Sequence, residues 1–377
     1  MPAARLAHPV PATALRAAVA GPAADADAAD AHPLVAAAAA YAAERLRPAA
    51  LTTDAVGVTA EQIDDLADLG LLNHLAGERY GGAALGRAED RRIHEHVSSA
   101  CLNTWLVWAQ HAPLARRVES ALVDPPPPGG VIDALLRGRI LAGAGLSDVR
   151  RYPQRYVAAR SVGEGWRLTG TVSWVSGWGL NQAMLVAGVD AERERVVLAL
   201  VPIDDRFTAQ PIALTAVAGS RTARVRLEEV VVPSDLVLDV QPLERWRRAD
   251  RESAVDAKPH LFGFAAHVLA ELAQEPAQAA RDVVAAWTPR VRDLRARAYA
   301  LADAEDAEAR FAERLEVRIA SGEALTTLAR ALLIVRAGRG LEREDSAQYC
   351  VRSAHFLLVQ AQTESVRAAW LERLQGR

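Results

Sequence analysis

One stretch of sequence decides the fold: Gly165-Trp166-Arg167-Leu168-Thr169-Gly170-Thr171-Val172-Ser173-Trp174-Val175-Ser176-Gly177. Glycines punctuate it, and Leu168, Val172 and Val175 are residue types that favour a pleated, half-buried strand. A Trp and a Ser two residues apart on a strand point to the same face. Trp174 and Ser176 therefore suit either the wall of a flat ligand's site or the core of a sheet, and the stretch alone leaves both open.

The composition indicates a multidomain protein of ordinary charge. The chain has 377 residues, a length that suits two or three domains. Its net charge of −3 implies no field that attracts nucleic acid. Cys101 and Cys350 are the only cysteines, too few for a disulfide framework, which favours a cytoplasmic protein. No run of about 18 apolar residues occurs, so we expect no membrane span.

Helical signals dominate the first third of the chain. Residues 1–32 are rich in Ala and Pro and read as a flexible leader. From there to residue 138 we expect a helical domain. Thr59, followed three residues later by Gln62, predicts a helix N-terminus. The apolar spacing predicts one long helix over 87–120, and the run of prolines after it ends the helical pattern.

The middle of the chain, residues 139–240, is a β-rich island. Short apolar runs alternate there with Gly, Pro and Asp turns. Strands without intervening helices cannot build a βαβ sheet, so we expect an antiparallel barrel or sandwich. Residues 241–377 then return to helical spacing and predict a bundle of long antiparallel helices, over about 258–274, 276–303, 308–338 and 343–374. The predicted fold class is α+β.

Several chemical motifs are absent or weak. The sequence has no Gly-x-Gly-x-x-Gly after a strand, no phosphate loop and no nucleophile elbow. His94 and His96 lie two apart on a predicted helix, where their side chains diverge, so we expect no metal site there. The arginines at 245, 247, 248 and 251 alternate with acidic residues, which suits a solvated helix face or a site for a phosphate or CoA group.

Local motifs resemble those of one family, the acyl-CoA dehydrogenases and related flavoenzymes. Glu78-Arg79-Tyr80-Gly81-Gly82 resembles the family's E-x-Y-G-G turn. The run from Gly165 to Ser176 resembles its G-x-x-L-x-G-x-K-x-W-[IV]-[ST] signature, and Glu228-Glu229-Val230-Val231-Val232-Pro233 resembles the end of its β domain. These motifs lie in the first two predicted domains, and the order of helical domain, β domain and bundle agrees with them.

The resemblance implies an FAD cofactor between the β domain and the bundle. In the family the matching Trp packs beside the flavin ring and the matching hydroxyl lies near its N5 atom, roles that would fall to Trp174 and Ser176. Ser147 and Asp148 are the only matches to the family's T-E-P-x-x-G-S-D loop, and Ser147 is a further cofactor candidate. The family's motifs for the FAD diphosphate and adenine are not recognisable in the bundle, so FMN, or no flavin, is an alternative.

The reaction that the resemblance implies is α,β-dehydrogenation of an acyl thioester, carried by CoA or by an acyl-carrier protein. It needs a carboxylate to take the α-proton. The family's late position for this base is absent here, and Glu252 is the carboxylate nearest to its early position. The resemblance also implies a homodimer or homotetramer.

Three other functions stay open. They are a flavin-dependent monooxygenase on the same scaffold, which needs no carboxylate base, a non-catalytic paralogue that acts as an interaction partner, and a CoA-binding module without redox chemistry.

Overall fold

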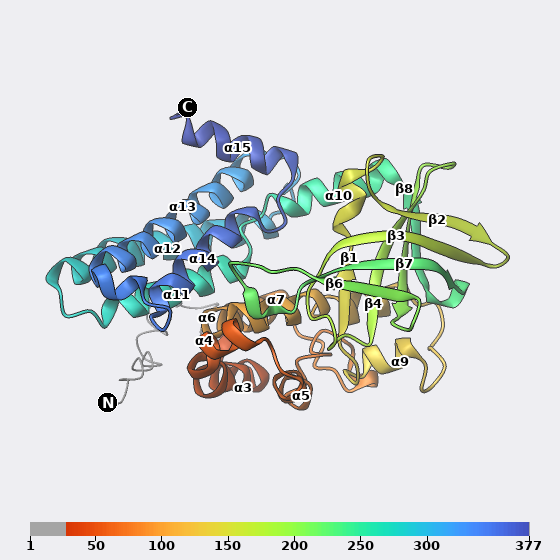
Figure 1. Ribbon diagram of the computed structural model, residues 1–377, viewed down its shortest axis with the longest axis horizontal. Coiled ribbons are helices and arrows are strands. Elements are labelled where there is room, and N and C mark those ends of the chain that lie inside the picture. Colours follow the sequence, from red (N-terminus) through yellow and green to blue (C-terminus); the bar gives the residue numbers. More distant parts are fainter. Residues whose placement is uncertain (1–27, 377) are drawn as a thin grey trace.

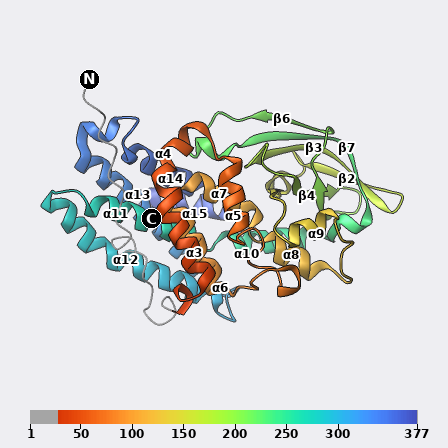
Figure 2. The same cartoon turned by 90° about the horizontal axis from the view of Figure 1, so that it is seen from below.

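The computed structural model describes residues 28–376, so most of the predicted leader lies outside the described part of the chain. Three regions follow one another, and Figure 1 shows them side by side: N-terminal helices along one edge, a twisted sheet at one end and a helical bundle at the other. Figure 2 shows the N-terminal helices crossing beneath both of the other regions. The predicted α+β architecture is confirmed.

The N-terminal region is entirely helical. Its elements are α3 (Pro33–Tyr41), the π-helical turn η1 (Ala42–Leu46), α4 (Arg47–Val56), α5 (Ala60–Asp68), η2 (Glu78–Tyr80), α6 (Arg87–Ala100), α7 (Leu102–His111), α8 (Leu114–Ala121) and α9 (Val131–Leu136). The expected cap is present, because Thr59 and Gln62 form a reciprocal capping box at the start of α5.

The expectation of one long helix over 87–120 is wrong. Cys101 has an extended backbone (φ −147°, ψ 110°) and separates α6 from α7. Pro113, which has no N–H to donate, separates α7 from α8. The apolar stripe continues across both breaks, so periodicity alone does not reveal them. The break at Cys101 turns α7 toward the sheet.

The central region is one mixed, mainly antiparallel sheet. Its strands are β1 (Ala142–Gly145), β2 (Val157–Val162), β3 (Gly165–Val175), β4 (Ala183–Asp190), β5 (Arg195–Pro202), β6 (Phe207–Pro211), β7 (Ala223–Val232) and β8 (Val237–Pro242). The order is β6-β7-β3-β2-β4-β5-β8, with β1 paired to β4. The antiparallel prediction therefore holds for most pairs, but β4 pairs in parallel with both β1 and β2.

The C-terminal region begins with α10 (Leu243–Ala254), which bridges the sheet and the bundle in Figure 1. The bundle contains α11 (Pro259–Ala273), α12 (Gln278–Asp303), α13 (Phe311–Arg336), α14 (Ser346–Val359) and α15 (Glu364–Leu374). The last predicted helix, 343–374, is in fact two, because the chain leaves helical geometry at Gln360. One apolar core joins the bundle to the N-terminal helices, and separate clusters fill the sheet.

Candidate functional site

Trp174 lies at the end of β3, where the strand is irregular. The pairing of β3 with β7 shifts register between Val172 and Val175, and both valines are fully buried. This bulge breaks the simple alternation of faces. As a result the Trp174 side chain is 38 % exposed whereas Ser176, just beyond the strand, is 2 % exposed. The shared face expected from their spacing is therefore not present.

The hydroxyl of Ser176 points into a small polar network. Its Oγ lies 3.0 Å from Oγ1 of Thr222, which lies 2.7 Å from Oγ of Ser220. Asn181 donates to the Ser176 carbonyl, and the next N–H, that of Gly177, donates to the Ser220 carbonyl. These bonds fasten the end of β3 to the turn before β7. Ser176 thus has structural partners already, and its predicted contact with a flavin stays a prediction.

A buried carboxylate holds the residue before Trp174. Asp148, in the short helix η3 (Ser147–Arg151), accepts hydrogen bonds from the Ser173 N–H at 2.6 Å and the Ser173 hydroxyl at 2.5 Å. Charge-assisted bonds of this length are strong and directional. The neighbouring Ser147 is exposed. Of the matched Ser-Asp pair, the aspartate is therefore the residue that fixes β3 next to Trp174.

Glu252 lies in the last turn of α10 and is half-buried. Its carbonyl accepts from Arg314 of α13, which also pairs with Asp256. Asp256 in turn pairs with Lys258 at 2.9 Å. The Glu252 carboxylate belongs to none of the ion pairs found among residues 28–376. In this it differs from Asp256, which pairs with both Arg314 and Lys258. Its predicted role as a base stays a prediction.

The arginine-rich start of the bundle is largely solvated. Arg247 pairs with Glu244 one turn earlier, and Asp250 receives two hydrogen bonds from Arg150 of η3. The second contact ties α10 to the sheet. The predicted run therefore acts in part as a structural link, and two of its acidic neighbours, Glu244 and Asp250, are engaged in ion pairs.

The two histidines of α6 point to different surroundings. Nδ1 of His94 accepts from the Trp105 indole at 3.0 Å, whereas Nε2 of His96 lies 3.5 Å from Asp30. Burial is the main reason that the pKa of each imidazole is lowered. Within the part of the chain that the structure describes, no group of His, Cys, Asp and Glu side chains is arranged to hold a metal ion.

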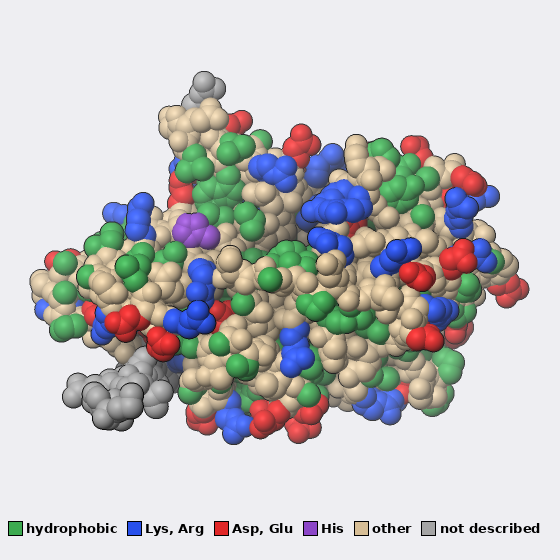
Figure 3. All heavy atoms as spheres, viewed as in Figure 1, with side chains coloured by type: hydrophobic (Ala, Val, Ile, Leu, Met, Phe, Trp, Pro, Cys, Tyr) green, Lys and Arg blue, Asp and Glu red, His purple; other side chains and the backbone are tan. Residues whose placement is uncertain are grey.

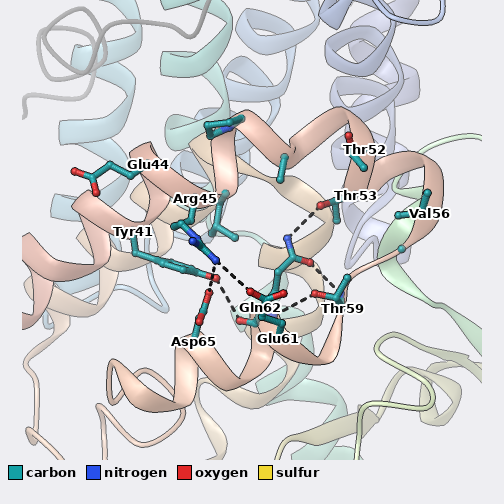
Figure 4. A pocket seen from close by; sticks show the side chains of 14 residues that line it. Tyr41, Glu44, Arg45, Thr52, Thr53, Val56, Thr59, Glu61, Gln62 and Asp65 are labelled. Carbon is teal, nitrogen blue, oxygen red and sulfur yellow. Dashed lines mark hydrogen bonds and ion pairs between the residues drawn. The ribbon is translucent and has the colours of Figure 1, made fainter.

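A separate pocket of about 480 Å³ lies in the N-terminal region, between α4 and α5 (Figure 4). The π-helical turn η1 lines one side of it with Glu44 and Arg45. Arg45 pairs with Glu61 at 3.2 Å, and the hydroxyl of Tyr41 faces α5. Burial and Asp65 raise the pKa of Tyr41 above its ordinary value. None of the predicted site residues lines this pocket.

Comparison with known proteins agrees with this architecture. A model of the N-terminal domain of acyl-CoA dehydrogenases matches residues 29–118. The whole chain also superposes on solved structures with that fold. Residues 29–118 thus match the N-terminal domain of the acyl-CoA dehydrogenases, and the chain has the overall fold of these enzymes. No curated protein sequence matches it.

The solved structures with a similar fold include different enzymes. Butyryl-CoA dehydrogenase from Megasphaera elsdenii superposes with a TM-score of 0.74 at 15% identity, over 91% of this chain and 97% of that one. Glutaryl-CoA dehydrogenase from Mycobacterium smegmatis superposes with a TM-score of 0.73 at 17% identity, over 94% of this chain and 95% of that one. Dibenzothiophene monooxygenase (TdsC) from Paenibacillus sp. A11-2 superposes with a TM-score of 0.73 at 16% identity, over 92% of this chain and 98% of that one. At these identities the likeness establishes the fold alone.

A flavin ring fits one observation in the structure. Large aromatic side chains are normally well buried. Trp174 instead presents part of its indole to solvent at the end of an otherwise buried strand segment. Such a flat apolar surface, held rigidly by Asp148 through Ser173, suits a planar ligand.

Among residues 28–376, no helix is long and apolar enough to cross a membrane.

Proposed function

We propose that this protein is a flavin-dependent oxidoreductase of the acyl-CoA dehydrogenase superfamily that dehydrogenates an acyl thioester at its α and β carbons. The observation that carries the proposal is the partly exposed indole of Trp174 at the bulged end of β3, in a chain with the acyl-CoA dehydrogenase fold. In this proposal FAD lies against Trp174, near Ser176 and Ser147. The substrate is carried by CoA or an acyl-carrier protein.

The chain's own residues would divide the work. Trp174 orients the flavin ring through its flat face, and Asp148 keeps that indole in place by holding Ser173. Glu252, the carboxylate without an ion-pair partner in the described chain, would take the α-proton. When bound, the flavin supplies the acceptor for the hydride.

A second candidate function is a flavin-dependent monooxygenase. The carboxylates on either side of Glu252 are both engaged, Asp250 with Arg150 and Asp256 with Arg314 and Lys258. Glu252 is thus the only acidic group of this segment with no ion-pair partner in the described chain, and the dehydrogenase depends on it as the base. A monooxygenase needs no such base, so it is the matching function if Glu252 takes no part in the reaction. FMN-bound TdsC is a solved structure with this fold, which makes FMN the matching cofactor for this alternative.

The visible spectrum of the purified protein tests both functions. We expect a bound flavin, identified after release, which acyl-CoA bleaches in the absence of oxygen. Product formation from externally reduced flavin and oxygen, without anaerobic bleaching, would favour the monooxygenase instead. If no flavin co-purifies and none binds on titration, both enzymatic functions fail and a non-catalytic paralogue remains.

Two substitutions test the residue assignments. Trp174→Ala should weaken flavin binding roughly tenfold and shift the flavin spectrum, because stacking on the indole is lost. Trp166→Ala, at the opposite end of β3, is the control and should leave flavin affinity unchanged. Glu252→Gln should abolish α-proton exchange of the substrate while flavin binding persists, and full exchange by that variant would remove Glu252 from the mechanism.

The proposal includes a homodimer or homotetramer in the cytoplasm. Light scattering coupled to size-exclusion chromatography measures the oligomeric state directly. A strictly monomeric protein that binds flavin normally would contradict this part of the proposal without affecting the rest.

A further inference from the structure

The segment after Ser147 is unusually rich in arginine. Arg150, Arg151 and Arg155 lie within six positions of one another, at the end of η3 and just beyond it. Among residues 28–376, two carboxylates form ion pairs with them. Asp250 is taken by Arg150 through two hydrogen bonds of 2.7 Å, and Asp148 faces the other two arginines. The segment therefore carries more positive charge than it neutralises.

Asp148 cannot fully neutralise both guanidinium groups. Its two oxygens already accept short hydrogen bonds from Ser173. Arg151 and Arg155 stay 3.7 and 3.8 Å from it, beyond hydrogen-bond distance. Arg151 instead donates a long bond of 3.3 Å to the Ser173 hydroxyl. Both side chains are about half exposed, so most of their N–H donors face outward.

Arg151 of this basic group reaches the strand position next to Trp174. Ser173, which Arg151 contacts, is the residue directly before it. The short helix η3 is the yellow turn that follows β1 in Figure 1, on the side of the sheet that faces the bundle. In Figure 3, Lys and Arg side chains gather where the sheet meets the bundle, beside a hollow in the surface.

A second cation approaches from the bundle. Arg318 of α13 is 7 % exposed and donates to two carbonyls, those of Ala254 and Gln360. In the described chain no carboxylate lies within ion-pair distance of it. Burial, followed by the charge of Arg150, lowers the pKa of Arg318 to about 10. Arg150, next to the sheet, and Arg318, in the bundle, thus repel each other, and an anion bound between them would reduce this repulsion.

We propose that Arg151 and Arg155 bind a phosphate group of the ligand that lies against Trp174. Guanidinium groups present paired donors that match phosphate oxygens, and such charge-assisted bonds are about twice as strong as neutral ones. The phosphate is that of a flavin nucleotide or of the phosphopantetheine arm of a thioester substrate. The identity of the ligand rests on the proposed flavin function, whereas the phosphate site itself does not.

Matched ligands that differ by one phosphate test the site. We would titrate the full-length protein with riboflavin and FMN, and separately with pantetheine and 4′-phosphopantetheine. In the unmodified protein the phosphorylated member of at least one pair should bind about tenfold more tightly. The double variant Arg151→Gln/Arg155→Gln should reduce that ratio to near one. Arg160→Gln/Arg193→Gln removes the same charge from two other exposed positions, one in β2 and one in the turn between β4 and β5, and should leave the ratio intact.

The outcomes separate the sources of the phosphate. Loss of the preference for FMN assigns the site to the flavin, and loss of the preference for phosphopantetheine assigns it to the substrate. A ratio that the double variant leaves unchanged in both pairs, or that the control lowers equally, overturns the proposal. If neither flavin binds the unmodified protein, the proposed function fails and the pantetheine pair alone decides the phosphate site.

Discussion

Glu95 offers the sharpest test of how the two helical regions are joined. Its carboxylate is fully buried in α6 and accepts hydrogen bonds from Arg92 of the same helix and from Arg295 and Tyr299 of α12. Burial alone would lower the pKa of Arg295, yet Glu95 raises it overall, and burial together with Glu95 raises the pKa of Tyr299. Arg295 therefore keeps its positive charge.

Glu95→Gln keeps the shape of the side chain but removes the charge that two guanidinium groups share. Breaking a buried ion pair from one side costs about 3–5 kcal/mol, because an uncompensated charge is left behind. Arg92 keeps Asp30 as a second partner at 2.7 Å, so we expect a loss near 3 kcal/mol. That is a large part of the ~5–15 kcal/mol by which typical domains are stable.

Urea unfolding, followed by circular dichroism and by tryptophan fluorescence, measures this loss. Asp303→Asn is the matched control, because Asp303 also links α12 to α6, through Arg87 and Arg91, but is 43 % exposed. An exposed pair contributes less than about 1 kcal/mol. Equal losses in the two variants, or a loss below about 1 kcal/mol for Glu95→Gln, would refute the reasoning from burial.

Three further predictions concern the sheet and the buried histidines. Asp148→Asn should lower the free energy of unfolding by about 1–3 kcal/mol and weaken flavin binding, because an NH₂ group replaces one of the two oxygens that accept hydrogen bonds from Ser173. Unchanged flavin affinity would show that this contact does not support the site. Gly177→Ala should lower the free energy of unfolding in urea by about 1–3 kcal/mol more than Gly179→Ala. Both glycines have positive φ, but only at Gly177 would the new methyl group lie 2.8 Å from an α7 side chain. Burial lowers the pKa of His111 and His267 from 6.5 to about 4, so the unfolded chain binds more protons between these pH values. The free energy of unfolding should therefore fall as the pH drops from 6.5 to 4, by up to ~1.4 kcal/mol per pH unit for each group, and His267→Leu should flatten that slope.

The order of the three regions follows from the sequence because it depends on periodicity and punctuation. Continuous apolar runs between turn residues predict the buried strands β4 and β5, and the Thr59 cap is a local hydrogen-bond pattern that four residues encode. The break at Cys101 is different, since neither a Gly nor a Pro marks it and the apolar spacing runs through it. Contacts made by the folded chain, such as the Tyr349 hydroxyl that accepts from the N–H of Leu102, stabilise that break.

The candidate site shows the same limit at the scale of single side chains. Spacing placed Trp174 and Ser176 on one face, but the bulge before Val175 exposes the indole and leaves the hydroxyl buried. A bulge depends on the pairing of β3 with β7, so no window of the β3 sequence alone contains it. Asp148 accepts two hydrogen bonds from Ser173, the residue before the indole, whereas the side chains of Arg151 and Arg155 are about half exposed. A planar ligand with an anionic tail would use both properties, since the ring needs a fixed wall and the phosphate needs donors that can close around it.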